Sequence, residues 1–189
     1  ECLTGKGRLR GLGGGWVIKR LGDVAEISKG QLITESTAIP GDVPVIAGGK
    51  KPAYFHNRAN RTGKTITISG SGASAGYVAF YESPIFASDC PTIGGGGNYS
   101  VEFIYFVLLL NQEVIYKAQT GGAQPHIHPD DLRPLMIHVP LDCSEQAAIA
   151  TILSDMDTEL VALESRLAKA RQIKQGMMHE LLTGRIRLI

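Results

Sequence analysis

Residues 142–183, DCSEQAAIATILSDMDTELVALESRLAKARQIKQGMMHELLT, decide the architecture of the C-terminal part of this chain. They contain no proline, and Gly176 is their only glycine. Apolar side chains recur at intervals of three and four residues, which lines them up on one face of an α-helix. The members of this apolar seam are Ile149, Leu153, Met156, Leu160, Leu163, Leu167, Met177 and Leu181. The stretch therefore predicts a long coiled-coil-type α-helix whose seam needs a partner helix.

Both ends of this helix carry terminal signals. Asp142 and Glu145 have the spacing of a capping box, in which Asp142 accepts hydrogen bonds from the first amides and Glu145 reaches back. Gly184 follows the last apolar residues, as a C-cap glycine does. Gly176 costs the helix interior about 1 kcal/mol relative to alanine, and either a close helix crossing or simple tolerance accounts for it.

The part before Pro140 shows the mixed pattern of strands and a helix. Residues 65–69 alternate with period two, as a half-buried strand does, and residues 77–81 predict a second strand after a Gly/Ser turn. Residues 102–117 are apolar enough for one buried helix, and residues 135–139 predict a final strand. The fold class that follows is a mixed α/β globular domain, succeeded by the long helix.

The beginning of the chain resembles its end. Residues 1–9 match residues 180–188 at six of nine positions, and both copies read as the end of a helix. We therefore interpret the chain as one repeat of a two-repeat protein. The expected organisation is a remnant of a preceding helix with a glycine-rich linker in residues 1–15, a globular domain in residues 16–143, and a helix with its tail in residues 144–189.

Composition predicts a cytoplasmic protein that does not enter a membrane. The net charge is +1, and 43% of the residues are hydrophobic. Cys2, Cys90 and Cys143 are odd in number and lack ligand-like spacing, which argues against a disulfide framework or a cysteine metal site. The longest apolar run, residues 103–110, is far shorter than the ~20 residues that a spanning helix needs.

Positive charge is concentrated in one stretch. The 39 residues between Asp42 and Glu82 contain no acidic residue. They contain instead the candidate DNA-contacting residues Lys50, Lys51, His56, Asn57, Arg58, Arg61 and Lys64. Lysine and arginine neutralise phosphates, while arginine and asparagine also bind base edges in pairs of hydrogen bonds. A solvated loop whose charges serve solubility is the alternative.

Two further loops carry candidate polar residues. Residues 72–76, GASAG, match the nucleophile elbow of hydrolases, but that elbow needs a helix directly after the serine, and a strand is expected here. A dinucleotide-binding loop fails for the same reason. Gln124 and His126 lie in a Gly/Pro-rich loop, from which glutamine can pair with adenine and histidine can reach phosphate or base. His126 and His128 also have a weak metal-like spacing.

Several segments, taken in order, resemble the specificity subunit of Type I restriction–modification enzymes. They are residues 16–24 (WVIKRLGDV), 68–76 (ISGSGASAG), 86–90 (FASDC), 121–127 (GGAQPHI), 145–150 (EQAAIA) and 173–184 (IKQGMMHELLTG). The resemblance covers essentially the whole chain. It implies a distal target-recognition domain followed by the distal conserved helix, which pairs antiparallel with a second conserved helix.

The resemblance also implies a function and partners. The globular domain would read one half of a bipartite site on double-stranded DNA, with Ser71 and Ser74 near the DNA. Methyltransferase (modification) subunits would dock on the helices, and a motor-nuclease (restriction) subunit would join for cleavage. The chain itself would be non-catalytic and would need no cofactor or metal. Arg166, Lys169, Arg171 and Lys174 on the outer helix face are either a docking surface or simply solvated.

Two alternatives stay open at this point. The chain can be a coiled-coil protein–protein scaffold whose globular head binds protein. It can also be the recognition part of a fused methyltransferase-nuclease. In every case the bare seam predicts pairing of helices, and we expect a homodimer of this chain through the long helix.

Overall fold

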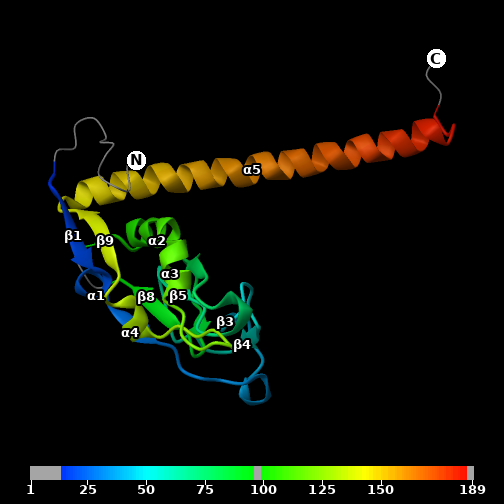
Figure 1. Cartoon of the computed structure of the whole chain (residues 1–189). Coiled ribbons are helices and arrows are strands. Elements are labelled where there is room, and N and C mark those ends of the chain that lie inside the picture. Colours follow the sequence, from blue (N-terminus) through cyan, green and yellow to red (C-terminus); the bar gives the residue numbers. More distant parts are fainter. Residues whose placement is uncertain (1–13, 96–98, 187–189) are drawn as a thin grey trace. The chain divides into compact units, whose positions relative to one another are not determined.

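The computed structural model describes residues 14–95 and 99–186. The chain divides into two compact units, and the division falls between Ala150 and Thr151 (Figure 1). The predicted helix remnant and most of its linker, in residues 1–13, lie outside the described residues. The mixed α/β character of the globular unit and the long C-terminal helix are both confirmed.

A four-stranded antiparallel sheet of order β2-β8-β5-β6 forms the centre of the globular unit. Its strands are β2 (Ile27–Lys29), β8 (Pro91–Gly94), β5 (Thr65–Ile68) and β6 (Val78–Tyr81). The predicted strands at 65–69 and 77–81 are thus confirmed as β5 and β6. The expectation of a half-buried β5 is wrong, because all four of its residues are buried. A central strand with both faces covered buries threonine as well as isoleucine.

A second sheet has the order β4-β3-β7. Its strands are β3 (Val43–Ile46), β4 (Tyr54–His56) and β7 (Phe86–Ala87), with β3 antiparallel to β4 and parallel to β7. Ile46, Ile85, Ala87 and Cys90 form a small buried cluster under this sheet, with Tyr81 against it.

The chain enters and leaves the globular unit side by side. Strand β1 (Trp16–Arg20) pairs antiparallel with β9 (Met136–Pro140), with Trp16 opposite Pro140 (Figure 1). Leu141 N donates to Gly15 O over 2.9 Å and extends this pairing. The predicted strand at residues 135–139 is confirmed as β9. The short helices α1 (Leu21–Val24) and α4 (Pro129–Leu132) flank the two strands in sequence.

The predicted single helix over residues 102–117 is wrong. Two helices, α2 (Val101–Leu110) and α3 (Gln112–Lys117), are separated at Asn111. Asn111 has φ −95° and ψ 15°, and its Nδ2 donates to Val107 O over 2.7 Å. A side chain that binds its own backbone in this way competes with helix continuation. Two 3-10 turns, η2 (Glu35–Thr37) and η3 (Gly72–Ser74), complete the unit.

The long helix is confirmed as α5, Cys143–Leu182. Asp142 Oδ1 accepts from Ser144 N over 2.8 Å, so the first half of the predicted cap is right. Glu145 does not reach back, because its side chain is buried in the globular unit instead. Gly184 has φ +72°, and Arg185 N donates to Glu180 O over 3.0 Å, as in a glycine C-cap.

Candidate nucleic-acid interface

Three loops that are far apart in the sequence meet in the globular unit. Ser69 Oγ donates to Gly49 O over 3.2 Å, which joins residues 47–51 to residues 69–77. Gly72 N donates to Pro125 O and Ile127 N donates to Gly70 O, each over 3.0 Å, which joins residues 69–77 to residues 120–128. We call the exposed side of these segments the three-loop surface; its predicted site residues are Lys50, Lys51, Ser71, Ser74, Gln124 and His126.

One glycine allows two of the loops to come this close, and a second shapes the third loop. A Cβ built on Gly48 would lie 2.7 Å from Ser71 O, which is a backbone clash. Gly121 has φ +86°, and a Cβ there would lie 2.6 Å from Gln124 O. A larger residue at Gly48 would push the 47–51 and 69–77 loops apart, and one at Gly121 would distort the 120–128 loop itself.

The charge of the three-loop surface suits an anionic ligand. Residues 47–51, 69–77 and 120–128 contain no aspartate or glutamate. Lys50 and Lys51 are exposed. The Nζ of Lys50 lies 5.2 Å from the centroid of the Tyr77 ring, within the range of a cation–π interaction. The Tyr77 ring holds the Lys50 ammonium over the loop, and the N–H donors of the ammonium stay available for phosphate.

The remaining polar residues of this surface differ in exposure. Gln124 is exposed, while Ser71, Ser74 and His126 are partly buried, and Ser71 and His126 form an isolated β-bridge. The His126 ring stacks on that of His128 at 6.3 Å between centroids. In the described parts of the chain, no group of three or more His, Cys, Asp or Glu side chains is arranged to hold a metal ion.

Asn57 and Arg58 follow β4 and are exposed. Asn57 N donates to Ile39 O over 3.0 Å, and a Cβ on Gly41 would lie 2.4 Å from Asn57 Cα. This segment therefore packs on the loop that precedes β3, and it forms a second basic position beside β4.

His56 is placed differently from our expectation of a DNA-contacting side chain. It is only 6% exposed. Its Nδ1 lies 3.1 Å from both the amide and the carbonyl of Ile39, and its ring contacts Phe86 edge-on at 5.2 Å. A side chain enclosed by these neighbours has no surface for DNA, so we correct the set by removing His56.

Arg61 is committed to internal hydrogen bonds. Its Nε donates to Thr92 Oγ1 over 2.9 Å and its Nη1 to Asn60 O over 2.8 Å. Its Nη2 donates to Ser28 Oγ over 3.2 Å and to Lys29 O over 3.0 Å. These bonds tie the segment before β5 to strands β2 and β8, and they give Arg61 a structural role that its sequence context did not indicate.

Lys64 is exposed but pairs with Glu102 at the start of α2. The hydrogen bond to Glu102 and its negative charge raise the pKa of Lys64. Partial burial acts to raise the pKa of Glu102, but hydrogen bonds from Lys64, the backbone and Ser100 outweigh it and hold the pKa below its usual range. Ser100 also caps α2 by accepting from Phe103 N over 3.2 Å.

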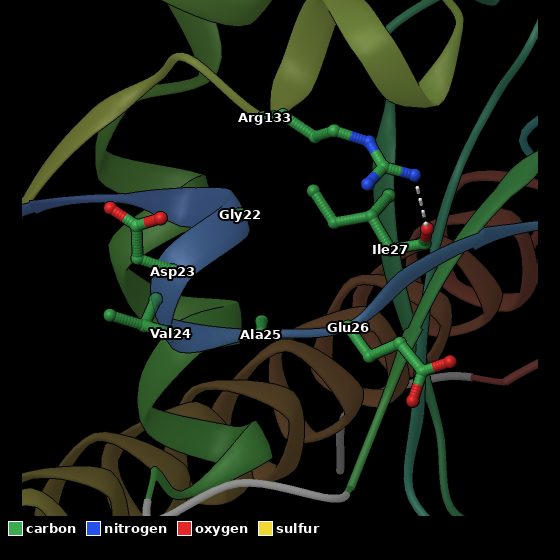
Figure 2. A pocket seen from close by; sticks show the side chains of 7 residues that line it. All are labelled: Gly22, Asp23, Val24, Ala25, Glu26, Ile27 and Arg133. Atoms are coloured by element: carbon green, nitrogen blue, oxygen red, sulfur yellow. Dashed lines mark hydrogen bonds between the residues drawn. The ribbon is translucent and has the colours of Figure 1, made fainter.

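A depression of about 430 Å³ lies beside α1, away from the predicted site residues in sequence. Figure 2 shows the Arg133 guanidinium crossing it to Ile27 O, to which Nη2 donates over 3.1 Å. The carboxylates of Asp23 and Glu26 point to different sides and do not converge with Arg133 (Figure 2). The depression thus lacks the convergent groups of a catalytic site.

Sequence reasoning missed three residues that shape the three-loop surface. They are Tyr77, under Lys50, and the carboxamides Gln112 and Gln119, which bind the backbone of residues 75–78. Tyr77, an aromatic residue directly after a Gly/Ser turn, could have been predicted from the sequence as part of this surface. The two glutamines gave no such signal, because their hydrogen-bond partners lie 34 or more positions away.

The helix seam divides into two parts. Ile149 is only 2% exposed and packs in the globular unit, so it is unavailable to a partner helix. Leu153 and Leu181 are half-buried. Five seam residues are between 46% and 55% exposed: Met156, Leu160, Leu163, Leu167 and Met177.

The outer helix face is exposed as well; its residues are Arg166, Lys169, Arg171 and Lys174. Exposure therefore does not decide whether this face docks a partner or is simply solvated.

The chain thus combines a loop surface that carries lysines and no acidic residue with a long helix that exposes an apolar seam. Comparison of the sequence with known families is decisive on the class. The chain belongs to the Type I restriction modification DNA specificity domain family, whose sequence model matches residues 13–175. No helix among the described residues is both long enough and apolar enough to span a membrane.

Individual relatives agree with this membership. A protein of Mycoplasma pneumoniae named as a type I specificity subunit is 28% identical over 172 residues, which cover 89% of this chain and 46% of that protein. A counterpart from Mycoplasma genitalium is 26% identical over 172 residues, covering 89% of this chain and 45% of that protein. The chain thus spans about half the length of the curated relatives it matches.

Solved structures share the fold. The S subunit of a Type I restriction–modification system from M. genitalium superposes with a TM-score of 0.75 at 25% identity, covering 94% of this chain and 48% of that one. The HsdS subunit from Thermoanaerobacter tengcongensis gives 0.60 at 18% identity, covering 93% of this chain and 46% of that one. The second likeness concerns the fold alone.

Proposed function

We propose that this chain is a non-catalytic DNA-recognition module of a Type I restriction–modification complex. Its globular unit reads one half of a bipartite site on double-stranded DNA. The single observation that carries the proposal is the family membership over residues 13–175. The acid-free three-loop surface supports it, because it joins phosphate-binding lysines to side chains able to read base edges.

Within this proposal the polar residues divide by task. Lys50 and Lys51 contact phosphates and set the register, with Lys50 steadied over the Tyr77 ring. Gln124 and His126 contact base edges from the neighbouring loop, with Ser71 and Ser74 beside them. Asn57 and Arg58 add a second contact next to β4. Lys64 stands apart from these contacts, since its ammonium is paired with Glu102 and the pair carries no net charge.

The long helix sets spacing and recruits partners. The exposed seam from Met156 to Met177 pairs with a second helix, either in a homodimer of this chain or in a longer specificity subunit. Methyltransferase subunits dock on the paired helices, and a motor-nuclease subunit joins them for cleavage. Methyl transfer and cleavage then belong to those partners, and the complex works in the cytoplasm. One solved structure that shares this fold concerns complex assembly of another type I R-M system, in line with such partners.

A binding experiment tests the three-loop surface. In the double substitution Lys50→Ala and Lys51→Ala, two phosphate contacts are lost, so the slope of log K against log salt should become about two units shallower. Lys174→Ala, an exposed lysine of the helical unit, is the matched control and should leave the slope unchanged. Equal slopes for the wild-type chain and the double variant would remove these lysines from the interface.

A second experiment tests the function itself. The intact protein is isolated with any co-purifying methyltransferase, and adenine methylation is mapped on DNA incubated with the complex. We expect a bipartite motif, one half of which changes when residues 16–143 are exchanged for another recognition domain. Absence of a methyltransferase, of methylation and of salt-dependent DNA binding would favour the scaffold alternative, for which the exposed seam is the supporting feature. A methyltransferase domain on the same polypeptide would favour the fused enzyme.

A further inference from the structure

Two carboxamide side chains hold the turn that carries Ser74. The turn runs through η3 and ends at Val78, where β6 begins. Its own hydrogen bonds are short range: Ala75 N donates to Gly72 O and Tyr77 N donates to Ser74 O, each over 2.9 Å. Backbone bonds from Gly76 N to Ser69 O over 2.8 Å and from Gly72 N to Pro125 O over 3.0 Å also hold it, and the two carboxamides add bonds to residues 75–78.

Gln112, the first residue of α3, binds the end of this turn in two ways. Its Nε2 donates to Gly76 O over 2.7 Å, and its Oε1 accepts from Val78 N over 3.2 Å. The carboxamide therefore satisfies one carbonyl and one amide as a paired strand would. Gly76 has φ +79°, and a Cβ there would lie 3.1 Å from the Tyr116 ring, so the turn also packs closely on α3.

Gln119 connects the same turn to the neighbouring loop. Its Nε2 donates to Ala75 O over 2.7 Å. The next residue, Thr120, exchanges backbone hydrogen bonds with His126, over 2.9 Å and 2.8 Å. Gln119 thus stands at the base of the 120–128 loop and holds the residue that directly follows Ser74. This side chain adds to the backbone bonds that join the loop carrying Ser74 to the loop carrying Gln124 and His126.

We propose that Gln112 and Gln119 are positioning residues that set the sequence discrimination of the three-loop surface. This inference rests on the proposed DNA-recognition function. Neither residue contacts DNA; each acts through the loop backbone that it holds. Base readout needs side chains at fixed positions, whereas phosphate contacts tolerate displacement. Loss of the Gln112 or Gln119 hydrogen bonds therefore reduces discrimination between DNA sites more than it reduces affinity for DNA.

The test compares two substitutions that remove equivalent hydrogen bonds. Gln119→Met keeps the length of the side chain but has no donor for Ala75 O. Gln146→Met makes the same change in a carboxamide that donates to Pro140 O over 3.0 Å and accepts from Ser100 N over 2.9 Å, neither of which lies in the two loops. Each full-length variant is assayed with its methyltransferase partner on the duplex identified by methylation mapping and on duplexes with one base pair changed in the same half-site.

We expect the ratio of methylation rates on the correct and the altered sites to fall about tenfold in Gln119→Met, the order of one lost base contact. The ratio should stay near that of the wild type in Gln146→Met, and the melting temperatures of both variants are measured in parallel. The positioning role would be overturned if the ratio of methylation rates were the same in both variants. A wild-type protein with no preference between the duplexes would instead contradict the proposed function.

A second measurement tests the hydrogen bonds of Gln112 to the turn without DNA. Hydrogen exchange of the Val78 amide is followed in the full chain with Gln112→Met, which removes the acceptor of that amide. Faster exchange at Val78, with unchanged exchange at buried Ile66 in β5, supports the role of Gln112 in holding the turn. Unchanged exchange at Val78 overturns it, whatever the DNA assay gives.

Discussion

Trp16 Nε1 donates a hydrogen bond to Glu145 Oε1 over 3.1 Å, across 129 positions of sequence. The bond joins the first strand of the globular unit to the first turn of α5. Glu145 is only 1% exposed, and its Oε2 has no hydrogen-bond partner among the described residues. The carboxylate therefore relies on Trp16 for the one hydrogen bond that the described structure gives it, and the two ends of the unit depend on each other.

Loss of this bond should destabilise the globular unit. Trp16→Phe keeps an aromatic ring against Phe103 but removes the N–H, so Oε1 of Glu145 loses its donor and, like Oε2, has none among the described residues. We expect the free energy of unfolding to fall by about 1–3 kcal/mol in urea titrations followed by circular dichroism. Ile18→Val, at an exposed position of the same strand, should change it by less than about 0.5 kcal/mol. Equal effects of the two substitutions would contradict the role of the bond.

Arg58 and Arg61 should respond differently to the same substitution. Arg61→Ala removes donors to Thr92, Asn60, Ser28 and Lys29, so stability should fall by about 1–3 kcal/mol. Arg58→Ala should leave stability within about 0.5 kcal/mol and make the salt dependence of DNA binding about one unit shallower. Thermal unfolding and DNA titrations at several salt concentrations measure both quantities. A stable Arg61→Ala variant would return that residue to the set of DNA contacts.

The Lys64–Glu102 pair predicts a small pH-dependent contribution to stability. The pKa of Glu102 is lowered in the folded state, so its contribution is complete above the unfolded value of about 4.3 and is lost as the pH falls through the lower folded value. The pKa of Lys64 is raised, so its contribution is lost as the pH rises above about 10.4 through the higher folded value.

Between these limits, Lys64→Met should lower the free energy of unfolding by less than about 1 kcal/mol, because the lysine is exposed. The difference between the variant and the wild type should shrink on acidification below about pH 4. Unfolding curves at pH 3 and pH 7 measure it, at about 50 mM salt to limit screening. A difference that stays constant over this range would mean that the pair contributes through packing alone.

Cys90 should be inert in the folded protein. The thiol is buried, its Sγ lies 3.5 Å from Ile46 O, and burial raises its pKa to about 12. Because the thiolate is the reactive species, native labelling with iodoacetamide at pH 8 should leave Cys90 unmodified. Peptide mapping by mass spectrometry before and after unfolding in urea measures this. Labelling of Cys90 at the rate of exposed Cys143 would show that the cluster around Ile46 opens readily.

Gly176→Ala tests the helix in isolation and in its assembly. A Cβ at Gly176 would meet no atom within 4 Å, so the substitution should stabilise α5 by about 0.5–1 kcal/mol. Circular dichroism during thermal unfolding measures the gain. If a partner helix crosses closely at Gly176, the same substitution should weaken association, which sedimentation of the chain over a range of concentrations detects. No gain in helix stability would contradict the open environment of this residue.

Local pattern was sufficient for the elements that depend on neighbours in sequence. The bounds of α5 follow from its apolar periodicity, from Asp142 at its start and from Gly184 at its end. The strands β5, β6 and β9 follow from alternation and turn residues. Each of these signals acts within one or two turns of chain, so the sequence alone reveals it.

The break at Asn111 and the burial of β5 were not predictable in the same way. Residues 102–117 have the apolar density of one helix, and only the Asn111 side chain bound to Val107 O reveals the interruption. The alternation in β5 indicates that one face of the strand is buried, whereas its other face is buried by elements elsewhere in the chain. Burial of this kind is a property of packing, which period alone does not encode.

By itself, the sequence determined the fold class, the long helix and its seam, and the acid-free stretch that contains the basic residues. Only the tertiary structure decided what each basic residue does: His56 is enclosed, Arg61 binds backbone and hydroxyl groups, and Lys50 stays exposed over Tyr77. The physical reason is that the exposure and the hydrogen-bond partners of a side chain are set by segments distant in sequence. Three such segments meet at the three-loop surface, and no local pattern predicts that they do.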